Sequence, residues 1–250
     1  MKAIALTGAV LLFIFFPCHF SYESTLKNPE PLKIMVPSSG TGDFEHGEVA
    51  KYDIRCLFAR VGSGEIEYIG REVLDGVAVH HVRSSFSRPG AVDNEDIYGT
   101  VGDFLPLVVK REISSLGGLR LETERYDQGK YIVEIDKRKG SDRETEKILS
   151  DGRLQNLILL FFDLRQRDLE PGMKIPVNLP GQKFVLEVKE ETEVEVPFGS
   201  FDAYEVSSAG GELRVWVSAR ENPLVLKAVL KNYLIGSYSM VLTGLAHPGA

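Results

Sequence analysis

Apolar and polar residues alternate along most of this chain, and the alternation is clearest over residues 184–218. Side chains at every second position of a strand lie on the same face of a sheet, so the pattern predicts strands with one buried face. Turn residues interrupt the pattern at 197–200 (PFGS) and at 210–211 (GG), which predicts three consecutive antiparallel strands. We expect their inner row to include Val194, Val196, Val215 and Val217.

The same alternation continues on both sides of this unit. Turn signals separate the runs: Gly62-Ser63-Gly64 is interpreted as a turn, Asp75-Gly76 as a two-residue hairpin, and residues 86–94 as a loop. The charged stretch 138–147 is interpreted as a solvated loop or an edge strand. The further strands are expected at 47–58, 65–74, 77–87, 95–101, 104–113, 119–126, 131–137, 173–177, 224–233 and 237–245.

One segment departs from the alternation. Residues 154–167 (LQNLILLFFDLRQR) are apolar almost all round, and the length of the run favours a helix over a strand. Ser150 or Asp151 is a plausible N-cap, and Pro171-Gly172 lies beyond the end of the run. A helix that is apolar on most sides should be buried on most sides. We therefore expect it across the mouth or the concave face of a curved sheet.

These elements define a fold class. Roughly eleven or twelve strands at regular spacing, with one helix, predict a large antiparallel sheet. A sheet of that size must curl, split or close to protect its edges. The expectation is a mainly β protein, a large curved antiparallel sheet or barrel-like fold with one buried apolar helix at about 154–167. A chain of 250 residues is compatible with a single domain, expected at 44–246.

The first residues carry a targeting pattern. Lys2 precedes an apolar run at 3–16, and Pro17 ends it. A bilayer span needs about 20 apolar residues, so the run is short for one and fits a secretory signal peptide, expected at 1–21. An uncleaved anchor, or lipidation at Cys18, are the alternatives. The Ser-, Pro- and Gly-rich residues 22–43 are expected to be a flexible tether. The protein is therefore expected to be exported to the periplasm or outer envelope, and not to be integral to the membrane.

The composition and net charge of the chain limit the kinds of molecule that it is expected to bind. The chain is 43% hydrophobic and 26% charged, which is ordinary for a globular protein. Its formal net charge of −7 argues against nucleic acid as the main partner.

A search for catalytic and metal-binding patterns finds none. His80 and His81 are adjacent on a predicted strand, so they face opposite ways and cannot chelate one metal together. The segment 199–202 (GSFD) is not a G-x-S-x-G nucleophile motif. The many carboxylates at 187–195 fit the solvated face of a strand. We predict no catalytic residue, no metal site and no cofactor, and a protein that is not an enzyme.

The order of features also resembles a known family. The stretches GEVAKYDIRCLFARVGSGEIEY, LQNLILLFFDLRQRDLEPG, EVPFGSFDAYEV and LRVWVSARENPLVLKAVLKNYLIGSYSMVL are similar to the exported bacterial family of domain of unknown function 3108, over about 44–245. The resemblance implies a curved, barrel-like antiparallel sheet in the periplasm or on the surface of a Gram-negative bacterium. Its motifs are turns and packing residues, and it supplies no catalytic residue.

The leading functional hypothesis is non-enzymatic binding of a hydrophobic or amphipathic ligand, such as a lipid, or of an envelope protein. It rests on the combination of a large curled sheet and an apolar helix, which can enclose an apolar cavity. Leu157, Phe161 and Trp216 are candidate cavity-lining residues. The competing interpretations are that the helix fills the core and that Trp216 packs within it. A structural or interaction module acting through sheet edges is the second hypothesis, and an envelope hydrolase is the third.

Overall fold

The computed structural model describes residues 44–57, 59–232 and 236–247. The expected signal peptide at 1–21 and the tether at 22–43 lie outside the described residues. Within the described part of the chain, no helix combines the length and apolar character needed to span a bilayer.

The described residues form one antiparallel sheet of 14 strands and a helix, α1 (Leu157–Arg165). The chain order of the strands is β1 (Glu48–Cys56), β2 (Ala59–Leu74), β3 (Val77–Arg88), β4 (Ala91–Thr100), β5 (Pro106–Ser115), β6 (Gly118–Asp127), β7 (Ile132–Lys139), β8 (Asp142–Leu149), β9 (Lys174–Leu179), β10 (Gln182–Val196), β11 (Gly199–Ser208), β12 (Leu213–Ser218), β13 (Val225–Asn232) and β14 (Gly236–Ala246). The predicted mainly β fold, a large curved sheet with a buried apolar helix, is confirmed.

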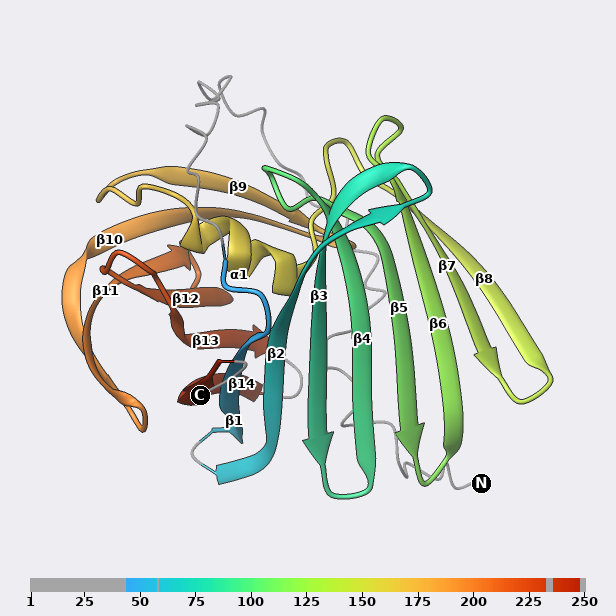
Figure 1. Cartoon of the computed structure of the whole chain (residues 1–250), viewed down its shortest axis with the longest axis horizontal. Helices are drawn as coiled ribbons and strands as arrows, with labels where there is room; N and C mark the ends of the chain where they lie inside the picture. The colour runs from blue at the N-terminus through green and yellow to red at the C-terminus, as the bar shows by residue number, and fades with distance from the viewer. Residues whose placement is uncertain (1–43, 58, 233–235, 248–250) are drawn as a thin grey trace, which may run out of the picture.

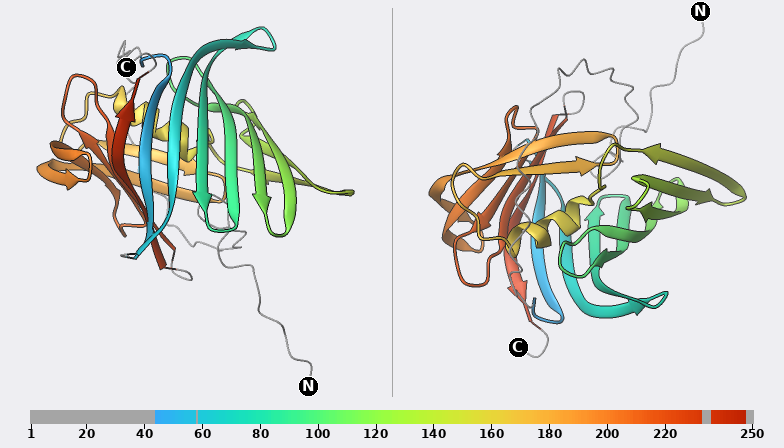
Figure 2. Two further views of the ribbon diagram at one scale, coloured as in Figure 1. Left: turned by 60° about the horizontal axis from the view of Figure 1, so that its bottom comes forward. Right: turned by 90° about the horizontal axis from the view of Figure 1, so that it is seen from above.

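The strand order shows how the chain builds this sheet. It starts in the middle at β1, runs outward by hairpins to one edge at β8, crosses through α1 to the other edge at β9, and returns by hairpins to β14 beside β1. The sheet curves around α1 without closing, and β8 and β9 are its two edges (Figures 1 and 2). We call β9–β14 with β1 and α1 the helix half, and β3–β8 the ladder half.

Helix α1 begins later than the sequence predicts. Asn156, and not Ser150 or Asp151, is the N-cap, because its side-chain Oδ1 accepts hydrogen bonds from the backbone N–H groups of Ile158 (2.8 Å) and Leu159 (3.2 Å). The helix covers Leu157–Arg165 within the expected 154–167. A helix this short is unstable alone, so packing must hold it in place.

Packing surrounds α1 on nearly every side. Leu157 is its only partly exposed residue, and the eight that follow are buried. Gly99 in β4 lets the helix approach the sheet backbone, since a Cβ at that position would lie 2.7 Å from Leu159 Cδ1. Val196, Val215 and Val217 are buried in the same hydrophobic core, and Val194 is partly buried against it.

A buried ion pair fixes the last turn of the helix. Arg165 Nη1 lies 2.7 Å from Glu48 Oε1 on β1, and Arg165 Nε donates to the carbonyl of Pro223 (2.6 Å). The same guanidinium lies over the rings of Phe44 (4.8 Å) and Phe162 (5.4 Å). These contacts tie α1 to the middle of the sheet and to the loop between β12 and β13.

Two predicted connections are wrong. Gly62-Ser63-Gly64 lies inside β2, where a Cβ at Gly64 would meet the ring of Phe86 at 2.5 Å, so this glycine serves close packing and not a turn. The predicted loop at 86–94 is a two-residue turn between β3 and β4, because the polar residues beside it pair across the strands. The predicted hairpin turn at Asp75 (φ 51°) and Gly76 (φ 82°) is confirmed, and the charged stretch 138–147 forms the β7–β8 hairpin and much of edge strand β8.

Candidate functional site

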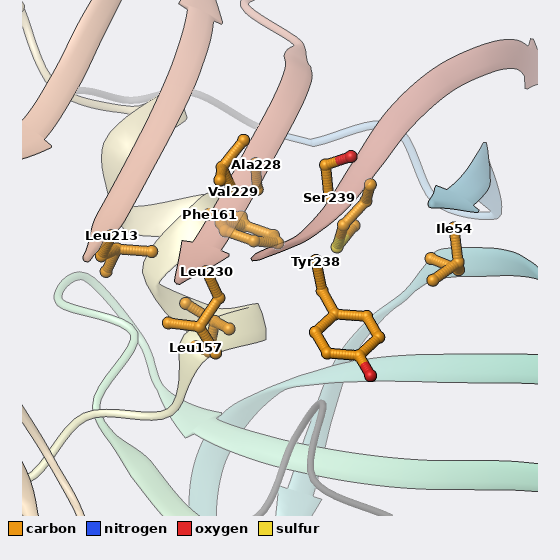
Figure 3. A pocket seen from close by; sticks show the side chains of 10 residues that line it. Ile54, Leu157, Phe161, Leu213, Ala228, Val229, Leu230, Tyr238 and Ser239 are labelled. Carbon is orange, nitrogen blue, oxygen red and sulfur yellow. The ribbon is translucent and has the colours of Figure 1, made fainter. Parts of the chain in front are cut away.

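An apolar pocket lies beside the start of α1 in the helix half. Its volume is about 20 Å³, which is room for about one water-sized group. Figure 3 shows the side chains that line it, which come from α1 and from strands β1, β12, β13 and β14. Leu157, Leu230 and Ser239 are partly exposed, so the pocket lies close to the surface. The lining residues are Ile54, Leu157, Phe161, Leu213, Ala228, Val229, Leu230, Tyr238, Ser239 and Met240.

The structure separates the three residues singled out from the sequence. Leu157 and Phe161 line this pocket. Trp216 does not lie among the lining residues: it pairs with Lys227, whereas its neighbour Val215 pairs with the pocket residue Ala228. Since successive residues of a strand face opposite ways, Trp216 lies on the convex face of the sheet.

The ladder half carries a row of charges on its concave face. Glu95 on β4 pairs with Arg111 on β5, Arg111 with Glu122 on β6, and Glu122 with Lys137 on β7. We call these four residues the charge ladder. Acid and base alternate along it, which is the favourable arrangement for cross-strand neighbours. Glu95, Arg111 and Glu122 are buried, and Lys137 is partly buried.

Side chains flanking the charge ladder complete its ion pairs. Arg111 Nε lies 2.7 Å from Asp93 Oδ1 and 3.2 Å from Glu95 Oε1. Arg120 pairs with Glu122, and Lys137 Nζ lies 2.7 Å from Glu146 Oε2. On β3–β5 the adjacent row of the same face consists of the buried Val82, Ile97 and Val109, and on β6 it continues to Glu124. The apolar part of this row lowers the polarity around Glu95 and Arg111.

Burial raises the pKa of two carboxyl groups in this region. It raises the pKa of Glu95 to about 7, although the Arg111 charge opposes the shift. Burial also raises the pKa of Glu124, to which the Tyr126 hydroxyl donates a hydrogen bond.

Proton uptake at these two groups would balance the charges of the cluster. Its carboxyl groups are Asp93, Glu95, Glu122, Glu124 and Glu146, and its cations are Arg111, Arg120 and Lys137. Protonation of Glu95 and Glu124 leaves as many carboxylates as cations.

The two histidines considered as metal ligands have other partners. His80 Nδ1 lies 2.8 Å from the Tyr68 hydroxyl, and its ring stacks on Phe104 with centroids 4.1 Å apart. His81 faces the other way and bridges Glu72 and Asp96, each at 2.8 Å. In the described ranges, no group of three or more His, Cys, Asp and Glu side chains is placed to hold a metal ion.

Sequence reasoning missed the charge ladder, although one signal for it exists. Arg111 stands between Val109 and Ile113 in an alternating run, so it interrupts a row that is otherwise apolar. A charged residue at an inner position requires a partner on the next strand. Which residue that is depends on strand register, which the pattern of one strand does not contain.

The described residues define a protein with an open, barrel-like antiparallel sheet around helix α1. The family model for "Protein of unknown function (DUF3108)" matches residues 51–243, so the chain belongs to this family. No curated protein matches the chain. Among solved structures, the chain is similar to a β-barrel-like protein of domain of unknown function DUF1849 from Brucella abortus. The identity is 9% and the TM-score 0.48, over 81% of this chain and 98% of that chain.

Proposed function

We propose that this protein is a non-enzymatic binding protein for an amphipathic ligand, such as a lipid, in the cell envelope. The observation that carries the proposal is the apolar pocket between α1 and the strands of the helix half. Its side chains are apolar apart from the hydroxyl groups of Tyr238 and Ser239. The end of an acyl chain matches such a lining.

The pocket is too small for a lipid chain, so side chains must move before a ligand can enter. A volume of about 20 Å³ does not hold an acyl chain, so Leu157 and Phe161 must move to widen it. Leu157 is the partly exposed first residue of α1, and its side chain has the fewest constraints of any in the helix. The ligand chain would displace these two side chains and lie along the start of the helix.

The charge ladder supports an amphipathic ligand over a purely apolar one. It lies on the same concave side of the sheet as α1, so a polar group of the ligand would have charged neighbours there while the ion pairs of the ladder stay intact. A ligand with one apolar end and one polar end can use both halves of the sheet at once.

We also propose that the protein is exported to the periplasm or outer envelope. The apolar run at 3–16 after Lys2 is the pattern of a secretory signal, and a protein of the periplasm or outer envelope meets lipids and envelope proteins as partners.

The carboxylates of the charge ladder and of the residues that flank it contact cations of the sheet, and this favours a non-enzymatic role. General acid or base catalysis needs a carboxyl group that faces a substrate. Asp93 and Glu95 instead contact Arg111, and Glu146 contacts Lys137. Glu95, with its pKa near neutrality, is the residue on which a hydrolase would have to depend, and the Ser84 hydroxyl and Arg111 hold it in place.

An interaction module acting through sheet edges is the second candidate, because the sheet is open at β8 and β9. Both edges carry features that oppose strand addition. Residues of β8 are mostly charged, and Asn178 of β9 exchanges backbone and side-chain hydrogen bonds with Gln155 (2.8 and 2.9 Å). The ligand-binding role is therefore the better supported of the two.

The test uses full-length protein expressed in a Gram-negative envelope and purified without detergent. Native mass spectrometry should detect a bound lipid-sized molecule, and a fluorescent fatty acid such as cis-parinaric acid should bind saturably. Ala228→Leu fills the pocket and should weaken fatty-acid binding about tenfold or more, whereas Ala78→Leu, at an exposed position of β3, should leave it unchanged. A protein that carries no lipid and gives no saturable fatty-acid signal would refute the proposal.

A further inference from the structure

Two cationic side chains lie over the ring of Trp216 on the convex face of the sheet. The guanidinium of Arg214 lies 5.2 Å from the centre of its ring, and the ammonium of Lys227 lies 4.9 Å from it. Both are within the range of a cation–π interaction. The ring is buried, and the aliphatic parts of the two side chains help to shield it from solvent.

These two cations lack the carboxylate partners that other cations of the sheet have. In the described part of the chain, neither Arg214 nor Lys227 has a carboxylate within ion-pair distance, and Arg214 Nε is buried without a hydrogen-bond acceptor. A guanidinium has five N–H donors and is always charged, so a buried N–H without an acceptor is unfavourable. The described part of the chain supplies no acceptor for this N–H group of Arg214.

A third cation, Arg55, is close enough to Lys227 to act on it electrostatically. Arg55 stands in the cross-strand row that runs through Ser239 and Val229 to Arg214. Its nearest carboxylate, on Asp53, is 3.7 Å away. Burial lowers the pKa of Lys227, and the charges of Arg214 and Arg55 lower it further, while Glu205 opposes them. The positive charges therefore repel one another, and an anion placed among them would relieve the repulsion.

We propose that Arg214 and Lys227, held beside Trp216, form a binding site for a phosphate group. Guanidinium groups bind phosphate oxygens through paired N–H donors, and a lysine adds a compact point charge. Arg55 adds a third positive charge from β1. Arg214 and Lys227 lie on the face of the sheet opposite the pocket residues Leu213, Ala228 and Leu230, so the site does not depend on the proposed ligand role. Free phosphate and the headgroup of an anionic lipid share the chemistry that it recognises.

Trp216 is the only tryptophan of the chain, so its fluorescence reports on this site alone. Inorganic phosphate is titrated into the full-length protein at constant ionic strength, with chloride as the replaced anion. A second arm uses vesicles of phosphatidylglycerol against vesicles of phosphatidylcholine. Arg214→Gln and Lys227→Met each remove a charge, and Lys227→Met keeps the aliphatic stem over the ring. Lys110→Gln is the control, because Lys110 lies over the Tyr98 ring (5.4 Å) in the other half of the sheet.

We expect a saturable fluorescence change with phosphate or with phosphatidylglycerol vesicles, and the responding arm identifies the source. Half-saturation should weaken about tenfold or more in Arg214→Gln and Lys227→Met, and stay unchanged in Lys110→Gln. Because these variants alter the surroundings of the tryptophan, the rise of Tm with phosphate or vesicles is measured in parallel, and it should be lost in the same two variants. No saturable response in either arm, or an equal response in all variants, would overturn the proposal.

Discussion

The helix half and the ladder half belong to one continuous sheet, yet they bury their concave faces by different means. In the helix half, α1 covers the strands, and the contacts around Leu159 and Leu160 are apolar. In the ladder half, Arg111 and its carboxylate neighbours lie buried beside apolar rows and are held by ion pairs. Apolar packing is insensitive to pH, whereas buried carboxyl groups are not. One sheet therefore combines a largely apolar core with a region whose stability depends on the protonation of buried carboxyl groups.

The largest effect is expected from Arg111→Met. It leaves Asp93 and Glu95 without their cation in a buried site, and breaking a buried pair by removing one partner costs about 3–5 kcal/mol. Urea unfolding at pH 8 measures the loss in the free energy of unfolding. A loss below about 1 kcal/mol would mean that the carboxylates are solvated in spite of their burial.

Leu159→Ala tests the helix half in the same way. Leu159 is fully buried and packs on the backbone at Gly99, so the cavity left by the truncation should cost about 2–5 kcal/mol. The cost should be the same at pH 5.5 and pH 8, because nothing titratable is removed. Urea unfolding at both pH values provides the check, and a cost that changes with pH would contradict the apolar account of this half.

Glu95→Gln should remove a pH dependence from the ladder half. The pKa of Glu95 is raised to about 7 in the folded protein, above its unfolded value, so the folded state binds this proton more tightly. Stability from this group is therefore present at low pH and is lost as the pH rises from about 4.5 to about 7, by about 3 kcal/mol.

Because glutamine does not ionise, the Glu95→Gln variant does not lose this stability as the pH rises. Wild type and Glu95→Gln should have similar stability at pH 5, and the variant should be the more stable at pH 8. Urea unfolding at the two pH values measures the difference, and parallel stability curves for the two proteins would rule the assignment out.

The smallest effect is expected from Arg143→Met at the outer edge of the ladder half. Arg143 pairs with Asp136, but its side chain is 61% exposed, and exposed ion pairs contribute about 0–1 kcal/mol. Measured beside Arg111→Met, this variant separates the effect of burial from that of charge pairing. Equal losses in the two variants would show that burial is not what makes Arg111 important.

Much of the fold could be predicted from the sequence, because the pattern of apolar and polar residues within each segment indicates whether it forms a strand or a helix. Alternation located the strands, the apolar run located α1, and Asp75-Gly76 located its hairpin. The misassigned glycine at Gly64 shows the limit of this approach. A glycine that makes room for Phe86 on another strand has the same sequence appearance as a glycine that turns the chain.

The candidate sites were harder to predict, because they depend on register between strands. Leu157 and Phe161 could be named as candidates because an apolar helix inside a curved sheet must face its interior, and both lie among the residues that line the pocket beside α1. The convex position of Trp216 follows from its pairing with Lys227, and the charge ladder follows from pairings such as Glu95 with Arg111. A shift of one residue in either pairing would reverse these faces, and the pattern within one strand does not specify it.

The most direct test of the difference between the halves is amide hydrogen exchange of the whole protein at pH 5.5 and pH 8, corrected for the intrinsic change in exchange rate. Peptides from β4–β7 should show a lower free energy of opening at pH 8 than at pH 5.5, because Glu95 is then charged and buried. Peptides from β12–β14 should show the same protection at both pH values, and α1 is not used as the reference because burial raises the pKa of its Asp163. A uniform change across both halves, or no change in β4–β7, would contradict the account.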